Sequence, residues 1–160
     1  MRTSIGTFIL IIVASIAAST IVISSQADAY PAEFSASVSL SGYERTLVAI
    51  NGTIVTAHVA DTEEKRRQGL SGTNTLSPQE GMLFVFPKDD HHSFWMKDMT
   101  YPIDIIWFSA KKQIVDIAYT VSPETYPESF SPQTNARYAL EVPAGFSSSH
   151  NLSIGDIASW

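Results

Sequence analysis

The chain has 160 residues, of which 44% are hydrophobic and 16% are charged, and its formal net charge at pH 7 is -6. This composition is typical of one globular domain and excludes a disordered protein, and the acidic balance argues against a nucleic-acid partner. The chain has no cysteine, which excludes disulfides, thiolate catalysis and cysteine-based metal centres.

The N-terminal part of the chain contains an uncharged, mainly apolar segment at residues 5–23. As a helix it is long enough to cross the hydrocarbon core of a bilayer, which predicts a membrane anchor. The alternative is a signal peptide that is cleaved after Ala27-Asp28-Ala29, a pattern with A-x-A spacing. Either interpretation makes residues 1–29 a delivery segment, residues 30–42 a tether and residues 43–160 a single globular domain. We expect that domain to lie outside the cytoplasm, membrane-anchored or secreted, and periplasmic in a suitable host.

The predicted domain begins with a hairpin and a short surface helix. Leu47–Ile50 and Thr53–Val59 are β-prone runs, and Asn51-Gly52 between them suits a type I′ turn. Residues 61–70 predict a helix, with Asp61 as its N-terminal cap and little apolar surface of its own. The helix should therefore lie on the surface of the domain.

The rest of the chain consists mainly of short apolar runs that are broken by Pro, Gly and Asp, a pattern typical of strands. The sequence predicts an α+β, β-rich fold with one short surface helix, built as a compact barrel-like sheet or as packed antiparallel or mixed sheets. The further predicted strands are Met82–Phe86, Ile103–Phe108, Ile114–Ala118, Arg137–Val142 and Ile157–Trp160.

Six short blocks occur in a fixed order along residues 59–156. They are Val59-Ala60-Asp61-Thr62 with Arg66 and Gly69-Leu70, Gly81–Phe86, Phe94–Met99, Pro102–Trp107, Leu140-Glu141-Val142 with Ala144-Gly145, and Gly155-Asp156. With this series the chain resembles the domain of unknown function numbered 192, a prokaryotic family of uncharacterised proteins. The resemblance implies a small β-rich domain behind a signal peptide or anchor, and it implies no reaction.

Four residues are candidate ligand-binding residues: Trp95, Lys97, Asp104 and Glu141. Asp104 interrupts an apolar strand, and a carboxylate there needs a partner or a raised pKa. It is a weak candidate for a general base, with Lys97 as its possible ion-pair partner, and the alternative is a structural residue that pairs with a cation or caps backbone amides. Trp95 and Lys97 would share one face of a strand and could line a pocket for a sugar or an acid, unless Trp95 is core and Lys97 points outward. Glu141 is the titratable residue that could act together with Asp104.

Metal and nucleotide cofactors are not expected. The run Asp89-Asp90-His91-His92 has the residue types of a metal site, but four consecutive residues rarely supply a closed ligand set, and a polar hairpin tip explains them. The chain has neither a phosphate-binding glycine loop of the Walker type nor a dinucleotide-binding glycine pattern.

Two functional hypotheses remain from the sequence, beside a purely structural role without a ligand. The first is a module that binds a small molecule or an envelope protein and is tethered to, or secreted across, the membrane. The second is a metal-independent hydrolase with Asp104 as general base. The hydrolase needs a second titratable group beside Asp104, so it loses its main support if Asp104 and Glu141 lie on opposite sides of the domain.

Overall fold

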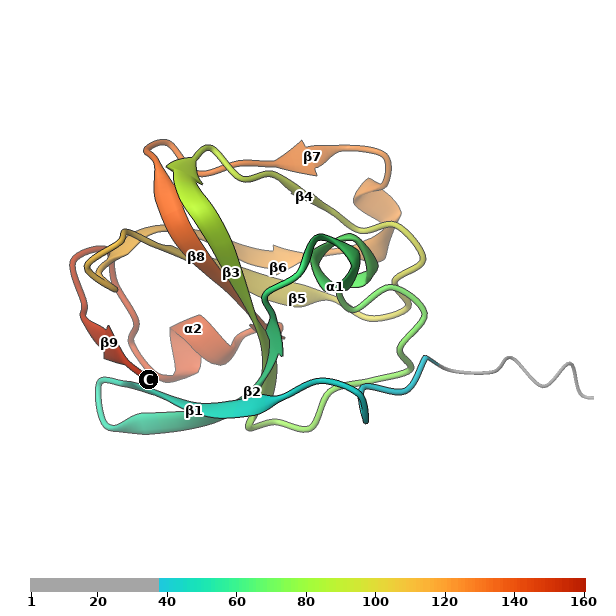
Figure 1. Cartoon of the computed structure of the whole chain (residues 1–160), viewed down its shortest axis with the longest axis horizontal. Helices are drawn as coiled ribbons and strands as arrows, with labels where there is room; N and C mark the ends of the chain where they lie inside the picture. Colours follow the sequence, from blue (N-terminus) through green and yellow to red (C-terminus); the bar gives the residue numbers. More distant parts are fainter. Residues whose placement is uncertain (1–37) are drawn as a thin grey trace, which may run out of the picture. The chain divides into compact units, whose positions relative to one another are not determined.

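The computed structural model describes residues 38–160, so the predicted delivery segment, residues 1–29, and residues 30–37 of the predicted tether lie outside the described residues. Seven strands form one mixed, curled sheet in the order β6-β5-β8-β3-β2-β1-β9, and β4 and β7 form a separate ribbon (Figure 1). Within the described part of the chain, no helix is long and apolar enough to span a bilayer. The strands are β1 Arg45–Ile50, β2 Thr53–Ala60, β3 Glu80–Asp90, β4 Phe94–Trp95, β5 Ile103–Phe108, β6 Ile114–Val121, β7 Ser129–Phe130, β8 Ala136–Pro143 and β9 Ala158–Ser159.

The β-rich α+β fold predicted from the sequence is confirmed. The predicted strands are present, with ends that shift by a few residues, and β3 continues beyond its apolar run to Asp90. The hairpin turn has positive φ at both central residues, 48° at Asn51 and 79° at Gly52, as a type I′ turn requires. Besides the predicted surface helix α1 (Glu63–Gln68), the structure contains α2 (Phe146–Ser149) and one turn of 3-10 helix, η1 (Pro123–Thr125).

The predicted N-terminal cap of α1 is wrong by one residue. Thr62 is the cap, because its extended backbone, φ -102° and ψ 159°, brings its hydroxyl to the free backbone N–H of Lys65. Asp61 lies one residue too early for this role, and its carboxylate instead accepts a hydrogen bond from Lys65 Nζ at 3.0 Å. Glu63 and Arg67, four residues apart on α1, form an ion pair with 2.7 Å between nitrogen and oxygen.

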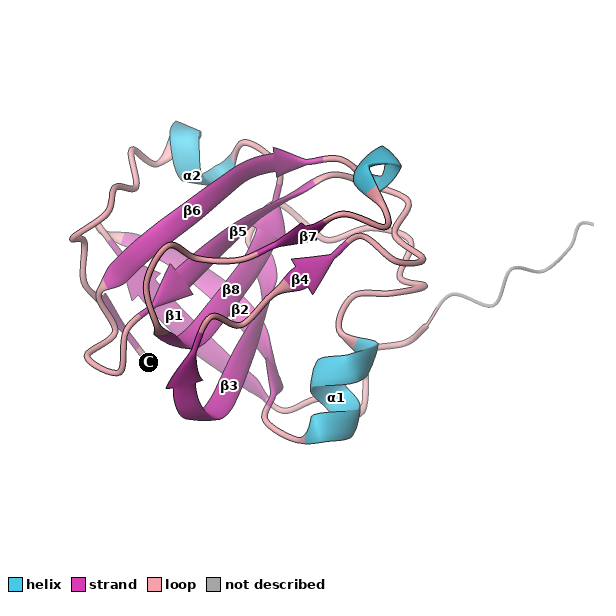
Figure 2. Ribbon diagram, turned by 90° about the horizontal axis from the view of Figure 1, so that it is seen from above, coloured by secondary structure: helices cyan, strands magenta, loops and turns pink. Residues whose placement is uncertain are grey.

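The centre of the sheet is buried on both faces, so its side chains form two separate cores. Along β5, Ile106 and Phe108 enter one core, while Ile103, Ile105 and Trp107 enter the other. We call these two sides the α2 face, where Phe146 of α2 packs, and the α1 face, where Leu70 from the segment after α1 packs. The ribbon of β4 and β7 lies over the sheet (Figure 2) and adds Phe94 and Phe130 to the α1-face core.

Candidate functional site

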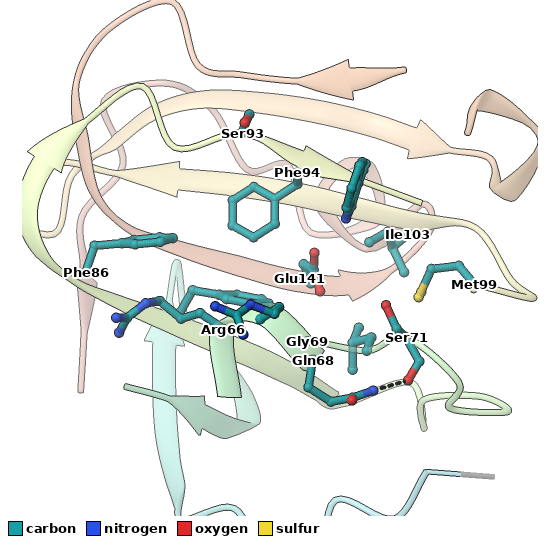
Figure 3. A pocket seen from close by; sticks show the side chains of 14 residues that line it. Arg66, Gln68, Gly69, Ser71, Phe86, Ser93, Phe94, Met99, Ile103 and Glu141 are labelled. Atoms are coloured by element: carbon teal, nitrogen blue, oxygen red, sulfur yellow. Dashed lines mark hydrogen bonds between the residues drawn. The ribbon is translucent and has the colours of Figure 1, made fainter. Parts of the chain in front are cut away.

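A cavity of about 270 Å³ lies on the α1 face and has Glu141 in its wall. The end of α1 and the turn after it contribute residues 66–71 to the lining. Strand β3 contributes Phe84 and Phe86, and β4 contributes Phe94 and Trp95. Figure 3 shows Phe86, Phe94 and Glu141 around the cavity. The remaining lining residues are Ser93, Met99 and Ile103. We call this cavity the Glu141 pocket.

The pocket has an exposed outer end and a closed inner end. At the outer end, the side chain of Arg67 is 77% exposed and Trp95 is 53% exposed. At the inner end, Phe84 is 1% exposed and Glu141 is 5% exposed. A ligand that enters past Arg67 and Trp95 therefore leaves water and meets an apolar wall that carries one carboxyl group.

Glu141 faces the pocket because of the alternation of β8. Leu140 and Val142 on either side of it point into the α2-face core, so Glu141 points to the α1 face. Its cross-strand neighbours are Met82 on β3 and Ile105 on β5, and both are fully buried. Neither neighbour carries a side-chain group that can donate a hydrogen bond, so the sheet around this carboxyl is apolar.

Burial raises the pKa of the Glu141 carboxyl from an ordinary 4.5 to about 8, and no hydrogen bond or charge from the described residues counteracts this desolvation. At neutral pH the group is therefore mainly uncharged, and it can both donate and accept a hydrogen bond. Nearby, burial also raises the pKa of Tyr101, against a hydrogen bond with Thr73, and the charge of Glu141 raises it further. The Tyr101 hydroxyl lies 2.6 Å from Thr73 Oγ1.

Arg66 fixes a positive charge in the pocket wall. Its Nη1 donates to the carbonyl oxygens of Asp61 at 2.6 Å and Val85 at 2.8 Å. Its guanidinium carbon lies 5.5 Å from the centre of the Phe86 ring, an arrangement that favours a cation–π contact. Both partners are neutral carbonyl groups, and these contacts hold the guanidinium in place. Its charge also acts on the Asp61 carboxyl, whose pKa is lowered mainly by the hydrogen bond from Lys65 and to a smaller extent by Arg66.

A second, more open cleft of about 670 Å³ adjoins the pocket, and we call it the outer cleft. Arg67, Gln68, Ser71 and Trp95 line both spaces. Hydrogen bonds hold this shared wall, because Gln68 Nε2 donates to the Ser71 carbonyl at 2.7 Å and Ser71 Oγ donates to the Lys97 carbonyl at 2.8 Å.

Trp95 and Lys97 both line the outer cleft, but they are not on one strand face as expected. Strand β4 ends at Trp95, and Asp98 has a positive φ of 55°, so Lys97 lies in a turn. The exposed Trp95 ring lies 5.8 Å from the ring of Tyr126 and is not part of the core. The turn, and not strand alternation, places these two candidate residues in one cleft.

Asp104 lies on the other side of the sheet from Glu141. It pairs in register with Val142, and its side chain shares the α2 face with Ile106. Its carboxylate is 0% exposed and accepts backbone hydrogen bonds from Thr120 at 2.8 Å, Gly145 at 3.1 Å and Ser147 at 2.8 Å. Its partners are thus backbone amides, as in the alternative interpretation, and not Lys97.

These amides explain what Asp104 does in the fold. Thr120 has a positive φ of 49° at an irregularity between β5 and β6, and its N–H points at Asp104. Gly145 and Ser147 lie at the start of α2, whose N-cap glycine has no side chain that could cap the helix. Asp104 therefore satisfies one free amide of the irregular strand and two of the helix start.

The histidine-containing run is held by local contacts. Asp89 binds Arg137 at 2.6 Å, and His91 Nδ1 donates to the Pro132 carbonyl at 2.8 Å. His92 stacks on Phe86 with 3.5 Å between ring centres, and its Nε2 donates to the Lys88 carbonyl. Among residues 38–160, no three His, Asp or Glu side chains lie close enough together to hold a metal ion.

The structure thus brings Trp95 into contact with two spaces, Glu141 into the inner one and Lys97 into the outer one, while Asp104 is in neither. Sequence reasoning missed Arg66 and the phenylalanines of β3 and β4 as lining residues. The phenylalanines were indistinguishable from core residues by pattern. Arg66 stood in the same ordered series as Gly69 and Leu70, but its spacing from other residues indicated no site.

Comparisons with known proteins agree with this fold. The sequence model of the DUF192 family, described as "Uncharacterized ACR", matches residues 46–160. A UPF0127 protein of Thermococcus gammatolerans is 30% identical over 113 residues, which cover 68% of this chain and 70% of that protein. A UPF0127 protein of Thermococcus sibiricus is 29% identical over 104 residues, which cover 64% of each chain.

Two solved structures are similar to this one. A protein of unknown function from Novosphingobium aromaticivorans has a TM-score of 0.72 at 24% identity, covering 78% of this chain and 91% of that chain. A protein from Sinorhizobium meliloti, described as a putative transcription regulator, has a TM-score of 0.69 at 25% identity. The match covers 73% of this chain and 94% of the Sinorhizobium chain.

Proposed function

The chain belongs to the DUF192 family, whose function is uncharacterised, and from this premise we propose that its domain is a small-molecule-binding module with its ligand in the Glu141 pocket. The single observation that carries the proposal is the Glu141 carboxyl, 5% exposed and without a hydrogen-bond partner among the described residues. Burying a polar group without a partner lowers the stability of a fold, so such a group is typical of a site whose partner is a ligand.

The shape and lining of the pocket support binding of an organic molecule. Seven of the 14 lining residues have apolar side chains, and the six polar ones come from α1, the turn after it, the residue before β4 and β8. This combination is the usual composition of small-molecule sites, in which apolar area supplies affinity and a few polar groups supply orientation. Trp95, half-exposed at the entrance, offers a ring against which a ligand can pack.

The module is proposed to act outside the cytoplasm, either tethered to the membrane or secreted. The support for this placement is the uncharged run at residues 5–23, which is suited to an anchor or a signal peptide. An envelope protein is the other partner that such a placement allows. The enclosed pocket favours a small molecule, because a protein partner would bind mainly to an open surface.

A nucleic-acid partner is not proposed, although the similar Sinorhizobium protein is described as a putative transcription regulator. The net charge of this chain is -6. Several of its cations are already paired with carboxylates: Lys65 with Asp61, Arg67 with Glu63, Lys88 with Asp90 and Arg137 with Asp89. Phosphate binding needs a patch of uncompensated positive charge, and these pairs do not provide one.

The alternative hydrolase with Asp104 as general base has no geometric support. A general base must reach the proton that it removes, and Asp104 is 0% exposed with its oxygens bound to three amides. Glu141, the proposed second titratable group, points to the opposite face of the sheet.

The experiment is a fragment screen by ligand-observed NMR at about pH 6.5, followed by protein-observed nitrogen–proton spectra for the fragments that bind, with the full chain and two variants. Glu141→Ala removes the pocket carboxyl, and Glu128→Ala removes an exposed carboxyl as a matched control. We expect fragments that bind wild type and Glu128→Ala, lose at least about threefold in affinity for Glu141→Ala, and shift the indole resonance of Trp95. The proposal is wrong if no fragment binds, or if every bound fragment binds Glu141→Ala equally well.

A further inference from the structure

The Glu141 pocket and the outer cleft share one wall, and this limits the shape of the ligand. The pocket, at about 270 Å³, lies at or below the lower end of small-molecule sites, whereas the cleft has about 670 Å³. Arg67, Gln68, Ser71 and Trp95 line both spaces. A ligand that fills the pocket therefore continues past Trp95 into the cleft, and we expect an elongated molecule with two chemically different ends.

The inner end of the ligand meets a hydrogen-bond donor. Glu141 lies between the apolar side chains of Met82 and Ile105, and no described residue donates to its carboxyl. An ionised carboxylate in these surroundings would have neither a compensating charge nor a hydrogen-bond donor, so the carboxyl group is protonated. Its O–H then needs an acceptor. A carbonyl oxygen on an apolar body satisfies that donor and leaves the aromatic wall in contact with carbon.

The outer end of the ligand meets positive charge. Arg66 in the pocket wall donates to two carbonyl oxygens and forms no ion pair within residues 38–160. Its charge acts only weakly on the Asp61 carboxyl, whose pKa is lowered mainly by the hydrogen bond from Lys65. Lys97 lines the outer cleft and takes part in none of the ion pairs found within residues 38–160. Two acidic residues, Glu64 and Asp98, also line this cleft, but neither lines the pocket. Arg67, the charged residue that lines both spaces, is paired with Glu63. The lining cations without such a pair within residues 38–160 are Arg66 in the pocket wall and Lys97 in the outer cleft, and they favour a carboxylate over an amine.

We propose that the ligand is an elongated oxo acid, with an apolar end that carries a carbonyl group in the pocket at Glu141 and a carboxylate at its other end, attracted by Arg66 and Lys97. The inference rests on the proposed binding function and adds the class of ligand. The two recognition elements are independent, because the carbonyl is recognised by a donor from β8 and the carboxylate by side chains of α1 and of the turn after β4.

Four probes of matched size separate these elements. Benzoylpropionate has both the ketone and the carboxylate, phenylbutyrate has the carboxylate only, butyrophenone has the ketone only, and phenylbutylamine has a cation in place of the acid. Affinities are measured by NMR titration with the full chain. We expect benzoylpropionate to bind best, phenylbutyrate and butyrophenone to bind about three- to tenfold more weakly, and phenylbutylamine to bind weakest.

Two variants assign each preference to its residue. In Glu141→Leu the preference for benzoylpropionate over phenylbutyrate, which lacks the ketone, should vanish. The preference for benzoylpropionate over butyrophenone, which lacks the carboxylate, should stay. In Lys97→Met the preference for benzoylpropionate over butyrophenone should fall about two- to fivefold, whereas Lys111→Met, which removes an exposed lysine elsewhere, should leave it unchanged.

The outcomes distinguish the class of ligand from the binding function itself. Preferred binding of phenylbutylamine, or preferences that persist in Glu141→Leu and Lys97→Met, would overturn the oxo-acid assignment while pocket binding stands. Failure of all four probes, when library fragments still bind in a Glu141-dependent way, would overturn it as well. Only the absence of every Glu141-dependent binder would overturn the proposed function.

Discussion

Asp104 and Glu141 are two buried acidic residues on adjacent strands, and they differ in almost every physical respect. Asp104 on β5 points to the α2 face, where three backbone amides bind its carboxylate. Glu141 on β8 points to the α1 face, where its carboxyl lines a pocket and no described residue binds it. The two residues lie on adjacent strands but on opposite faces of the sheet. The Asp104 carboxylate stabilises the fold, whereas the Glu141 carboxyl is available to a ligand.

The difference shows that burial alone does not identify a functional acid. Both residues interrupt apolar strands, and both would be classed as buried polar residues. The two residues differ in the hydrogen-bond donors around them. Backbone amides of an irregular strand and of a helix start donate to Asp104, whereas Glu141 is flanked by the apolar side chains of Met82 and Ile105. Changes at these two positions should therefore have opposite consequences for the stability of the fold.

The largest expected effect is at Asp104. Asp104→Asn removes the charge that three amides share and turns an N–H₂ group toward one of them, so the variant should lose about 3–5 kcal/mol of unfolding free energy. Urea unfolding of the full chain at pH 7, followed by tryptophan fluorescence, measures this loss. The matched control is Asp98→Asn in an exposed turn with positive φ, which should change stability by less than about 0.5 kcal/mol. An Asp104→Asn variant as stable as wild type would remove the structural role assigned to Asp104.

The next effect is a dependence of stability on pH that comes from Glu141. Its pKa is about 8 in the folded chain and near 4.5 when exposed, so between these values the folded state holds a proton that the unfolded state has lost. The stabilisation is complete below the lower value and disappears as the pH rises through the higher one. Stability relative to Glu141→Gln should thus fall by about 2 kcal/mol from roughly pH 6.5 to pH 8. Parallel stability curves for wild type and Glu141→Gln would refute the raised pKa.

A smaller effect of opposite sign is expected when Glu141 becomes apolar. Glu141→Leu removes a polar group that has no partner in the described residues, and it should raise the unfolding free energy by about 1 kcal/mol at pH 7. The same substitution should abolish the preference for a carbonyl ligand. Thermal unfolding combined with the probe titration checks both effects, and a destabilised variant would mean that Glu141 supports the fold in the way that Asp104 does.

The sequence was sufficient for the strands and for the selection of both acids, because alternation and an interrupting carboxylate are local signals. It was not sufficient to tell the acids apart. The amides that bind Asp104 come from positions 120, 145 and 147, and the pocket around Glu141 is assembled from α1, β3, β4 and β8. Contacts between such distant positions leave no pattern in a single sequence. For the same reason, Lys97 was a plausible ion-pair partner of Asp104 when only the sequence was considered.

The position of Arg66 could not be predicted from the sequence. As a residue of a short, polar surface helix it resembles Arg67, which forms an exposed ion pair with Glu63. Only the parallel pairing of β2 with β3 brings the carbonyl group of Val85 to Arg66 and turns its guanidinium over Phe86. Two adjacent arginines therefore differ: Arg67 is mainly exposed at the pocket entrance and paired with Glu63, whereas Arg66 is held in the pocket wall.

The most direct test of the contrast between the two acids is a carbon-NMR titration of the Glu141 side-chain carboxyl in glutamate-labelled full-length protein. The signal is assigned by its absence in Glu141→Gln. We predict that the Glu141 carboxyl titrates near pH 8, and that a bound oxo acid raises this midpoint because it accepts a hydrogen bond from the protonated form. A midpoint near the ordinary value of 4.5 would show that the carboxyl has partners or water in solution, and would contradict the account of an unpartnered acid in the pocket.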